Sequence, residues 1–236
     1  MDGKKYYCDK CQDTGYVLIA KEDGMSYARE CKCKELMDAR LRLKKSGLAK
    51  EFRAKSFDNY NTYNNQVLVS AKRVAIQYAD TYDQGVGDAS PSLLLCGQVG
   101  AGKTHLGTAC SMRLIDKGVA VIYMCYREEM TAIKSKIMDE IVYNREINRL
   151  KNAEVLFIDD FLKGKITEAD VNIIYEIINY RYNNNLPVII STEKTLEGLL
   201  DFDEAIGSRI IEMCRGFIIA FKGKELNYRI YRGGAA

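Results

Sequence analysis

The stretch LLLCGQVGAGKTHL, residues 93–106, decides how the chain folds. Four apolar residues run into a glycine, and two further glycines precede a lysine and a threonine. The apolar run predicts a buried strand, and the residues after Lys103 have the spacing of a helix. Gly97, Gly102, Lys103 and Thr104 fit the pattern G-x-x-x-x-G-K-[ST]. A strand, this pattern and a helix in that order predict a phosphate-binding loop.

The residue types of this loop suit an anion. Glycines let successive backbone N–H groups turn toward one centre, and the helix that follows adds the positive end of its dipole. Lys103 is expected to reach the β- and γ-phosphates, and Thr104 to hold Mg²⁺ through its hydroxyl. The alternative is a glycine-rich turn with a solvent-exposed lysine. The expected nucleotide-binding residues of the loop are Gly97, Gly100, Ala101, Gly102, Lys103, Thr104 and His105.

Short apolar runs alternate with helical stretches along the rest of the chain. A helix is expected over 67–82, and five alternating strands and helices imply an α/β fold, a parallel sheet covered by helices on both faces. The expected strands are Ser92–Cys96, Val119–Cys125, Val155–Asp159, Pro187–Thr192 and Phe217–Phe221, and the helices between them are Lys103–Lys117, Glu128–Leu150, Glu168–Asn185 and Asp203–Cys214.

The overall composition fits one globular domain with a small appendage. The chain has 236 residues, 47% of them hydrophobic and 28% charged, which is ordinary for a soluble protein. A net charge of +3 is too small to indicate nucleic acid by itself. No apolar run approaches the roughly 18 residues of a membrane span. The N-terminus lacks the apolar segment of a secretory signal, so a cytoplasmic location with reduced thiols is expected.

A second strand ends in two carboxylates. The run VLFIDD, residues 155–160, closes with Asp159 and Asp160. The carboxyl ends of parallel strands line the ligand crevice. Asp159 is therefore expected to bind Mg²⁺ through a water molecule, and Asp160 to orient or deprotonate a water that attacks the γ-phosphate. Taken alone, a strand that ends in Asp-Asp is often only a turn.

A third strand and two late arginines add polar groups. The run PVIISTEKT ends a strand in Ser191, Thr192 and Glu193, where a polar side chain would contact the γ-phosphate or the attacking water. The alternative is a helix cap, since Thr195 follows. Arg209 lies on an expected helix and Arg229 follows the last strand. Either arginine would stabilise transition-state charge, and the alternative for each is a surface salt bridge.

Taken in order, these segments resemble the AAA+ ATPases of the DnaC/DnaI helicase-loader family. The resemblance extends upstream to SFDNYN, residues 56–61, and to the N-terminal cysteines, so it covers nearly the whole chain. It is greatest for DnaI-like and phage-encoded loaders. The resemblance implies that the protein binds a hexameric replicative DNA helicase through its N-terminal part, and uses ATP and single-stranded DNA to place that ring on the template.

The resemblance also assigns roles, with two departures. Glu193 stands where many relatives carry asparagine, and a carboxylate beside a triphosphate would be repelled unless it faced away, which favours Thr192 as the sensor. Only 236 − 221 = 15 residues follow Phe221, too few for a helical lid, which leaves the role of Arg229 open. The implied roles are Lys103 and Thr104 in Walker A, Asp159 and Asp160 in Walker B, Thr192 and Glu193 at sensor 1, Arg209 as arginine finger and Arg229 as sensor 2.

Four cysteines near the N-terminus have metal-ligand spacing. Cys8, Cys11, Cys31 and Cys33 form C-x₂-C-x₁₉-C-x-C, and four thiolates suit a closed structural Zn²⁺ site. About 30 residues cannot bury enough core to fold alone, so a metal would supply the missing stability. Reduced free thiols or redox sensing are the alternatives. The expected organisation is a zinc-binding, helicase-interacting module over 1–47, a linker over 48–66 and the ATPase core over 67–236.

The leading hypothesis is an ATP-dependent helicase loader that self-associates through its ATP sites, with Arg209 of one subunit reaching the phosphate of the next. Basic residues in the tract 127–149 are the candidate contacts to single-stranded DNA, and a solvated helix face is the alternative. Other functions stay open: a transposition helper ATPase with a similar core, a nucleotide-switched zinc adaptor with negligible turnover, and a small-molecule kinase.

Overall fold

The computed structural model describes residues 8–20, 25–31, 33–34, 46–48, 54–82 and 91–231. The segment KELMDARLRLKKS, residues 34–46, predicts a further helix, and most of it lies outside the described residues. Within them, no helix is both long and apolar enough to cross a lipid bilayer.

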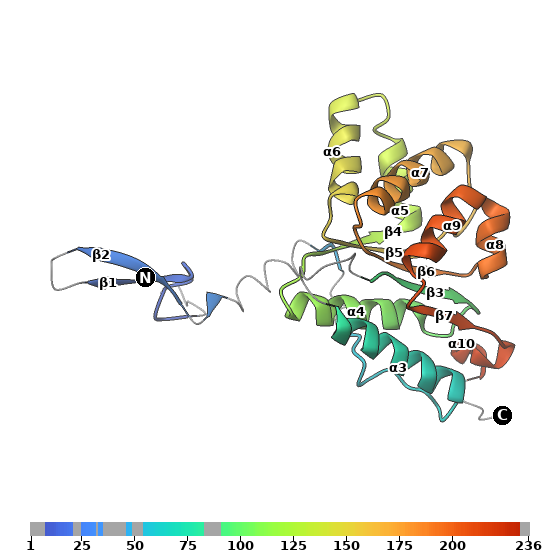
Figure 1. The fold of residues 1–236 in the computed structure, drawn as a ribbon, viewed down its shortest axis with the longest axis horizontal. Coiled ribbons are helices and arrows are strands. Elements are labelled where there is room, and N and C mark those ends of the chain that lie inside the picture. The colour runs from blue at the N-terminus through green and yellow to red at the C-terminus, as the bar shows by residue number, and fades with distance from the viewer. Residues whose placement is uncertain are drawn as a thin grey trace.

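A five-stranded parallel sheet forms the centre of the larger part of the described chain (Figure 1), as the sequence predicts. Its order is β4-β5-β6-β3-β7, so the strand that leads into the phosphate loop lies between the strands that end in Thr192 and Phe221. All five strands are short, and most of their residues are buried, as in a sheet covered on both faces. The strands are β3 Leu93–Gly97, β4 Val121–Cys125, β5 Val155–Phe161, β6 Val188–Thr192 and β7 Ile218–Phe221.

Helices cover both faces of this sheet (Figure 1). Alternate strand residues point to opposite faces, so Leu93 and Leu95 pack with α3 and α4, while Leu94 and Cys96 pack with the helices of the other face. The first face carries α3 Gln66–Thr81 and α4 Lys103–Asp116. The second carries α5 Tyr126–Lys134, α6 Glu140–Lys151, α7 Glu168–Asn183, α8 Leu196–Phe202 and α9 Glu204–Met213.

The single helix predicted over Glu128–Leu150 is wrong, because two helices occupy this stretch. The chain turns over 135–139 between α5 and α6. Asp139 caps α6, since its side chain accepts a hydrogen bond from the Val142 N–H, which satisfies a donor at a helix start. Helix α8 was not predicted. The Thr195 hydroxyl caps its start by accepting a hydrogen bond from the Gly198 N–H at 3.0 Å. The helix cap that the sequence offered as the alternative for this segment is therefore present.

Two further parts complete the described chain. After β7 come a short 3₁₀ turn, η1 Lys224–Leu226, and a one-turn helix, α10 Tyr228–Tyr231. Near the N-terminus, β1 Tyr16–Ala20 and β2 Ser26–Glu30 pair antiparallel, with Leu18 opposite Ala28. This hairpin joins the two pairs of cysteines.

Candidate nucleotide-binding site

The loop between β3 and α4 has the backbone that its glycines predict. Gly97, Gly100 and Gly102 have φ values of 102°, 74° and 83°, a region that side chains disfavour. The neighbours also leave no room for a side chain. A Cβ on Gly97 would lie 2.3 Å from the Phe221 carbonyl oxygen, and one on Gly102 would lie 2.6 Å from the Tyr60 ring. The loop is therefore held in a conformation that requires glycine at these positions, as the phosphate-loop pattern predicts.

Lys103 lies at the start of α4 and is buried. Its Nζ donates hydrogen bonds to the carbonyl oxygens of Gly97 at 2.9 Å and Gln98 at 2.7 Å. Burial lowers the pKa of Lys103, and the nearby carboxylates of Glu193 and Asp160 oppose that shift. The ammonium group thus lies against the loop backbone, within electrostatic range of the Glu193 and Asp160 carboxylates.

Asp159 forms the junction of three elements. Its Oδ1 accepts hydrogen bonds from Thr104 Oγ1 at 2.9 Å and from Ser191 Oγ, and its Oδ2 accepts one from Tyr123 OH at 3.1 Å. Burial raises the pKa of Asp159, and the hydrogen bonds from Ser191 and Thr104 oppose that shift. The Thr104 hydroxyl and the Asp159 carboxylate are hard oxygen ligands of the kind that Mg²⁺ prefers, so this pair fits the ion.

Asp160 lies at an irregularity in the sheet. The pairing of β5 with β6 shifts register between Ile158 and Phe161, and Asp160 has a φ of 55°. Such bulges re-aim side chains and often lie beside active sites. The Asp160 N–H donates to Ser191 Oγ at 3.0 Å, while its half-exposed carboxylate lines the pocket. The bulge therefore turns Asp160 into the pocket while Asp159 stays buried beneath it.

The structure brings Glu193, and not Thr192, to the pocket wall. Thr192 is fully buried, and its hydroxyl donates to the Phe161 carbonyl oxygen at 2.8 Å and accepts from the Lys194 N–H at 3.2 Å. The Glu193 carboxylate instead lies 3.2 Å from Lys163 Nζ. Thr192 thus joins β6 to the bulged end of β5, and its sensor role stays a prediction.

A pocket of about 390 Å³ extends from the phosphate loop. Two segments far apart in sequence form its other walls, residues 55–63 and the turn after β7. Tyr60 OH donates to the Ala101 carbonyl oxygen at 2.9 Å, and the Tyr63 and Tyr228 rings stack with centroids 6.4 Å apart and planes 13° from parallel. Sequence reasoning missed these tyrosines as site residues, although the resemblance included the segments that carry Tyr60 and Tyr228.

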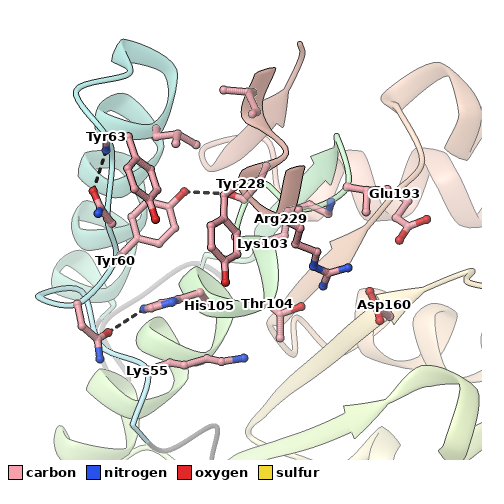
Figure 2. Close-up of a pocket in the computed structure, with 18 of the residues that line it drawn as sticks. Lys55, Tyr60, Tyr63, Lys103, Thr104, His105, Asp160, Glu193, Tyr228 and Arg229 are labelled. Carbon is pink, nitrogen blue, oxygen red and sulfur yellow. Dashed lines mark hydrogen bonds between the residues drawn. The ribbon is translucent and has the colours of Figure 1, made fainter. Parts of the chain in front are cut away.

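Two predicted site residues occupy the pocket wall in different ways. Figure 2 shows Arg229 reaching past Thr104 toward the side of the pocket where Asp160 lies. His105 turns toward the other wall, where its Nε2 lies 2.8 Å from the Ser56 carbonyl oxygen and 2.9 Å from Asn59 Oδ1. Burial lowers the pKa of His105. His105 therefore fastens residues 56–59 to the loop helix, beside the nucleotide pocket.

Arg209 does not line this pocket. It lies on α9, where its guanidinium carbon is 5.5 Å from the centre of the Tyr175 ring and 5.6 Å from that of Tyr182. Its Nη1 donates to the Ala205 carbonyl oxygen at 2.7 Å. Among the described residues no carboxylate forms an ion pair with Arg209, and its Nε is buried without a hydrogen-bond partner.

The basic tract proposed to contact DNA is largely ion-paired. Four of its five cations lie beside carboxylates, which reduces the positive charge that it offers to a phosphate backbone. The pairs are Lys134 with Asp170 at 2.7 Å, Lys136 with Glu146 at 3.5 Å, Arg145 with Glu146 at 3.2 Å, and Arg149 with Glu146 at 3.3 Å and with Glu129.

The four N-terminal cysteines converge on one point. Their sulfur atoms all lie within 4.8 Å of one another, and none forms a disulfide. The Sγ of Cys8 is 3.8 Å from that of Cys31, and the Sγ of Cys11 is 3.3 Å from that of Cys33. Zn–S bonds of about 2.3 Å in a tetrahedron place sulfurs about 3.8 Å apart. The donor set therefore fits a structural zinc ion.

The ionisation of Cys11 also suits a metal ligand. Burial raises its pKa, but hydrogen bonds from the Gly15 backbone and the other three thiols, Cys33 above all, outweigh that effect and lower the pKa to about 7, while the hydrogen bond to Cys11 raises the pKa of Cys33. A thiolate, and not a thiol, binds metal.

Comparison with known proteins agrees with this geometry. The chain is 35% identical to the phage-like element PBSX protein XkdC of Bacillus subtilis, over 97% of this chain and 88% of that protein. It is 25% identical to the replicative helicase loader DnaC of Buchnera aphidicola, over 73% of this chain and 68% of that protein. The crystal structure of DnaI matches 75% of this chain and 95% of its own, with 21% identity and a TM-score of 0.61.

The likeness to DnaI confirms the expected fold of the core, a five-stranded parallel sheet with helices on both faces. The model of the family described as IstB-like ATP binding protein matches residues 33–213. That range contains the phosphate loop, both carboxylates of the β5 end and Arg209. With the site geometry and a relative at 35% identity, this match shows that the chain belongs to the family of IstB-like ATP-binding proteins.

Proposed function

We propose that the chain is an ATP-dependent loader of a replicative DNA helicase. The observation that carries the proposal is the convergence of the phosphate loop, the Thr104–Asp159 pair and Asp160 at one edge of the sheet. The four-cysteine cluster, whose geometry suits a zinc ion, precedes this core in the same chain. The similarity to a replicative helicase loader of Buchnera aphidicola, over 73% of this chain, supports the choice of partner.

The chemistry that we propose is hydrolysis of ATP. Lys103 and the loop N–H groups would bind the β- and γ-phosphates, and Thr104 and Asp159 would hold Mg²⁺, which neutralises phosphate charge when bound. Asp160 would orient a water and accept its proton as the water oxygen bonds to the γ-phosphorus. The bond from that phosphorus to the bridging oxygen of ADP breaks in the same displacement. Arg229 would contact the phosphates from the same subunit.

A second subunit would complete the site. Arg209 lies outside its own pocket, on the surface of α9, with an unpaired charge among the described residues. In other phosphoryl-transfer sites, an arginine supplied by a neighbouring molecule stabilises transition-state charge and raises the rate by several orders of magnitude. ATP would therefore join subunits in a row, and hydrolysis would release them.

The cysteine module would bind the helicase. Four thiolates around Zn²⁺ leave no open coordination position, so the ion would stabilise the hairpin and take no part in catalysis. Single-stranded DNA is the remaining proposed ligand. Because most cations of the tract 127–149 are ion-paired, DNA binding there would require these Lys and Arg side chains to leave their carboxylate partners for phosphates.

A transposition helper ATPase is the second candidate, favoured by the match to the IstB-like family model. Size-exclusion chromatography of the chain with a hexameric replicative helicase and, separately, with a transposase distinguishes the two. We expect co-elution with the helicase only. Replacing Cys8 and Cys11 by Ser should remove bound zinc and this co-elution while ATP binding persists, and the control Cys125→Ser should change neither. Co-elution with the transposase alone would reverse the assignment.

A further inference from the structure

Lys163 lies in the nucleotide pocket without a role in the chemistry above. Its Nζ is 3.0 Å from Asp160 Oδ2 and 3.2 Å from Glu193 Oε1. One ammonium group thus bridges the residue proposed to accept the water proton and the unexpected carboxylate at the end of β6. These hydrogen bonds raise the pKa of Lys163, with the largest effect from Asp160.

The turn after β5 holds Lys163 at this place. Its N–H donates to the Asp160 carbonyl oxygen at 3.1 Å, and the flanking Leu162 and Gly164 have φ values of 60° and 97°. Leu162 is buried and anchors the turn. The Lys163 side chain itself is 42% exposed. The backbone is therefore fixed, while the ammonium group has room to change partners.

The balance of charges in the pocket indicates why a cation is needed at Lys163. Its lining holds four cations, Lys55, Lys103, Lys163 and Arg229, against the carboxylates of Asp160 and Glu193, which gives 4 − 2 = +2. A γ-phosphate adds about 1.5 to 2 negative charges at neutral pH. Two carboxylates without a neighbouring cation would repel it, and in a partly desolvated pocket that repulsion is larger than in water.

We propose that Lys163 is a γ-phosphate ligand that neutralises Asp160 and Glu193 and gives the pocket a preference for ATP over ADP. The inference rests on the proposed ATP site. A lysine suits this task because its ammonium group is a compact charge on a flexible stem. It can therefore contact a phosphate oxygen while it stays close to both carboxylates. The carboxylate that stands at sensor 1 then becomes compatible with a triphosphate.

If Lys163 had a purely structural role, its replacement would affect nucleotide binding differently. Exposed ion pairs contribute little to folding stability, and loss of such a pair would change the affinities for ATP and ADP alike. A γ-phosphate ligand affects ATP alone, because ADP lacks the group that it contacts. The ratio of the two dissociation constants therefore distinguishes these roles without any measurement of turnover.

The test is calorimetric titration of the full chain with Mg²⁺ and either ADP or a non-hydrolysable ATP analogue. In Lys163→Gln we expect the analogue to bind roughly tenfold more weakly, the effect of losing one charged hydrogen bond, while ADP affinity changes less than about twofold. Lys163→Arg should keep most of the preference. Lys165→Gln, which removes the same charge from the same exposed loop outside the pocket lining, should change neither affinity.

A second variant tests the coupling to Glu193. Adding Glu193→Gln to Lys163→Gln should restore part of the affinity for the analogue, because it removes the uncompensated carboxylate. If Lys163→Gln left both affinities unchanged, or weakened both by the same factor, the inference would be overturned while the proposed ATP site stands. Failure of the unaltered protein to bind either nucleotide would overturn the proposed function itself.

Discussion

Thr104 and Asp159 are 55 positions apart in the sequence, yet Thr104 Oγ1 donates a hydrogen bond to Asp159 Oδ1 at 2.9 Å. Thr104 lies in the first turn of α4, and Asp159 near the end of β5, two strands away from the strand that enters the loop. Because Tyr123 and Ser191 also donate to Asp159, three elements fix its carboxylate. The Mg²⁺ ligands that we propose are thus positioned by the fold itself.

This arrangement predicts the effect of Asp159→Asn. The variant should hydrolyse ATP roughly 10²–10³-fold more slowly, as on loss of one electrostatic stabiliser of the transition state, and its ATP affinity should no longer respond to Mg²⁺. Titrations of ATP with Mg²⁺ and with EDTA measure this. Tyr123→Phe removes one hydrogen bond to the same carboxylate and should keep the Mg²⁺ response. A full response in Asp159→Asn would refute the metal assignment.

Asp159 also predicts a pH dependence. Burial raises its pKa, and a proton competes with Mg²⁺ for the carboxylate. As pH falls, protonation of the folded site therefore begins above the ordinary aspartate range, and the Mg²⁺-dependent part of the ATP affinity should decline from there. The same titrations at several pH values check this, with Asp159→Asn as the control that shows no such decline.

Asp160→Asn should separate binding from turnover. The amide keeps the size of the side chain but cannot accept a proton from water, so the steady-state rate should fall about 10²–10⁴-fold. ATP affinity should stay within severalfold of the unaltered protein. Phosphate release and nucleotide titration on one preparation give both quantities. Hydrolysis at the normal rate would remove Asp160 from its proposed role.

Arg209→Ala should lose hydrolysis about 10³-fold while ATP binding to the isolated subunit persists. If the arginine acts on a neighbour, a mixture of Arg209→Ala with Asp160→Asn should recover activity, since an intact Asp160 then meets an intact Arg209. Arg215→Ala, an exposed arginine just after the same helix, should be active alone. No recovery in the mixture would argue against a shared site.

Gly102→Ala tests the geometry of the loop. A φ of 83° costs a non-glycine residue about 1–2 kcal/mol, and the new Cβ would meet the Tyr60 ring at 2.6 Å. Nucleotide affinity and thermal stability should both fall. Gly216→Ala is the matched control, because its Cβ meets nothing within 4 Å and its stability should change by less than about 0.5 kcal/mol. Equal effects of the two substitutions would contradict the account of the loop.

The sheet and the phosphate loop were predictable because their information is local. Apolar runs that end in glycine or aspartate specify strands, and G-x-x-x-x-G-K-[ST] specifies the turn between β3 and α4. The break between α5 and α6 also had a local sign, Asp139 before Glu140 at a helix start. The long amphipathic pattern across residues 128–150 concealed it.

Other parts of the site depend on contacts between distant residues. Nothing near Tyr63 in the sequence indicates its stacking on Tyr228, since the pairing requires the chain to return after β7. The position of Glu193 in the pocket follows from its place after Thr192, whose hydroxyl binds the bulged end of β5. The bridge made by Lys163 needs both the bulge at Asp160 and that neighbouring strand. Strand order and register set these contacts, and neither can be predicted from any single segment of the sequence.

We expect a triphosphate to bind at the edge of the sheet that carries Lys103, Thr104 and Asp159. The most direct test is calorimetry, in which a non-hydrolysable ATP analogue together with Mg²⁺ is titrated into the unaltered protein and, in parallel, into Lys103→Ala. We predict saturable binding of one nucleotide per chain, weakened roughly tenfold or more in Lys103→Ala by loss of a charged contact. Absence of binding to the unaltered protein, or equal affinity in the two proteins, would contradict the claim.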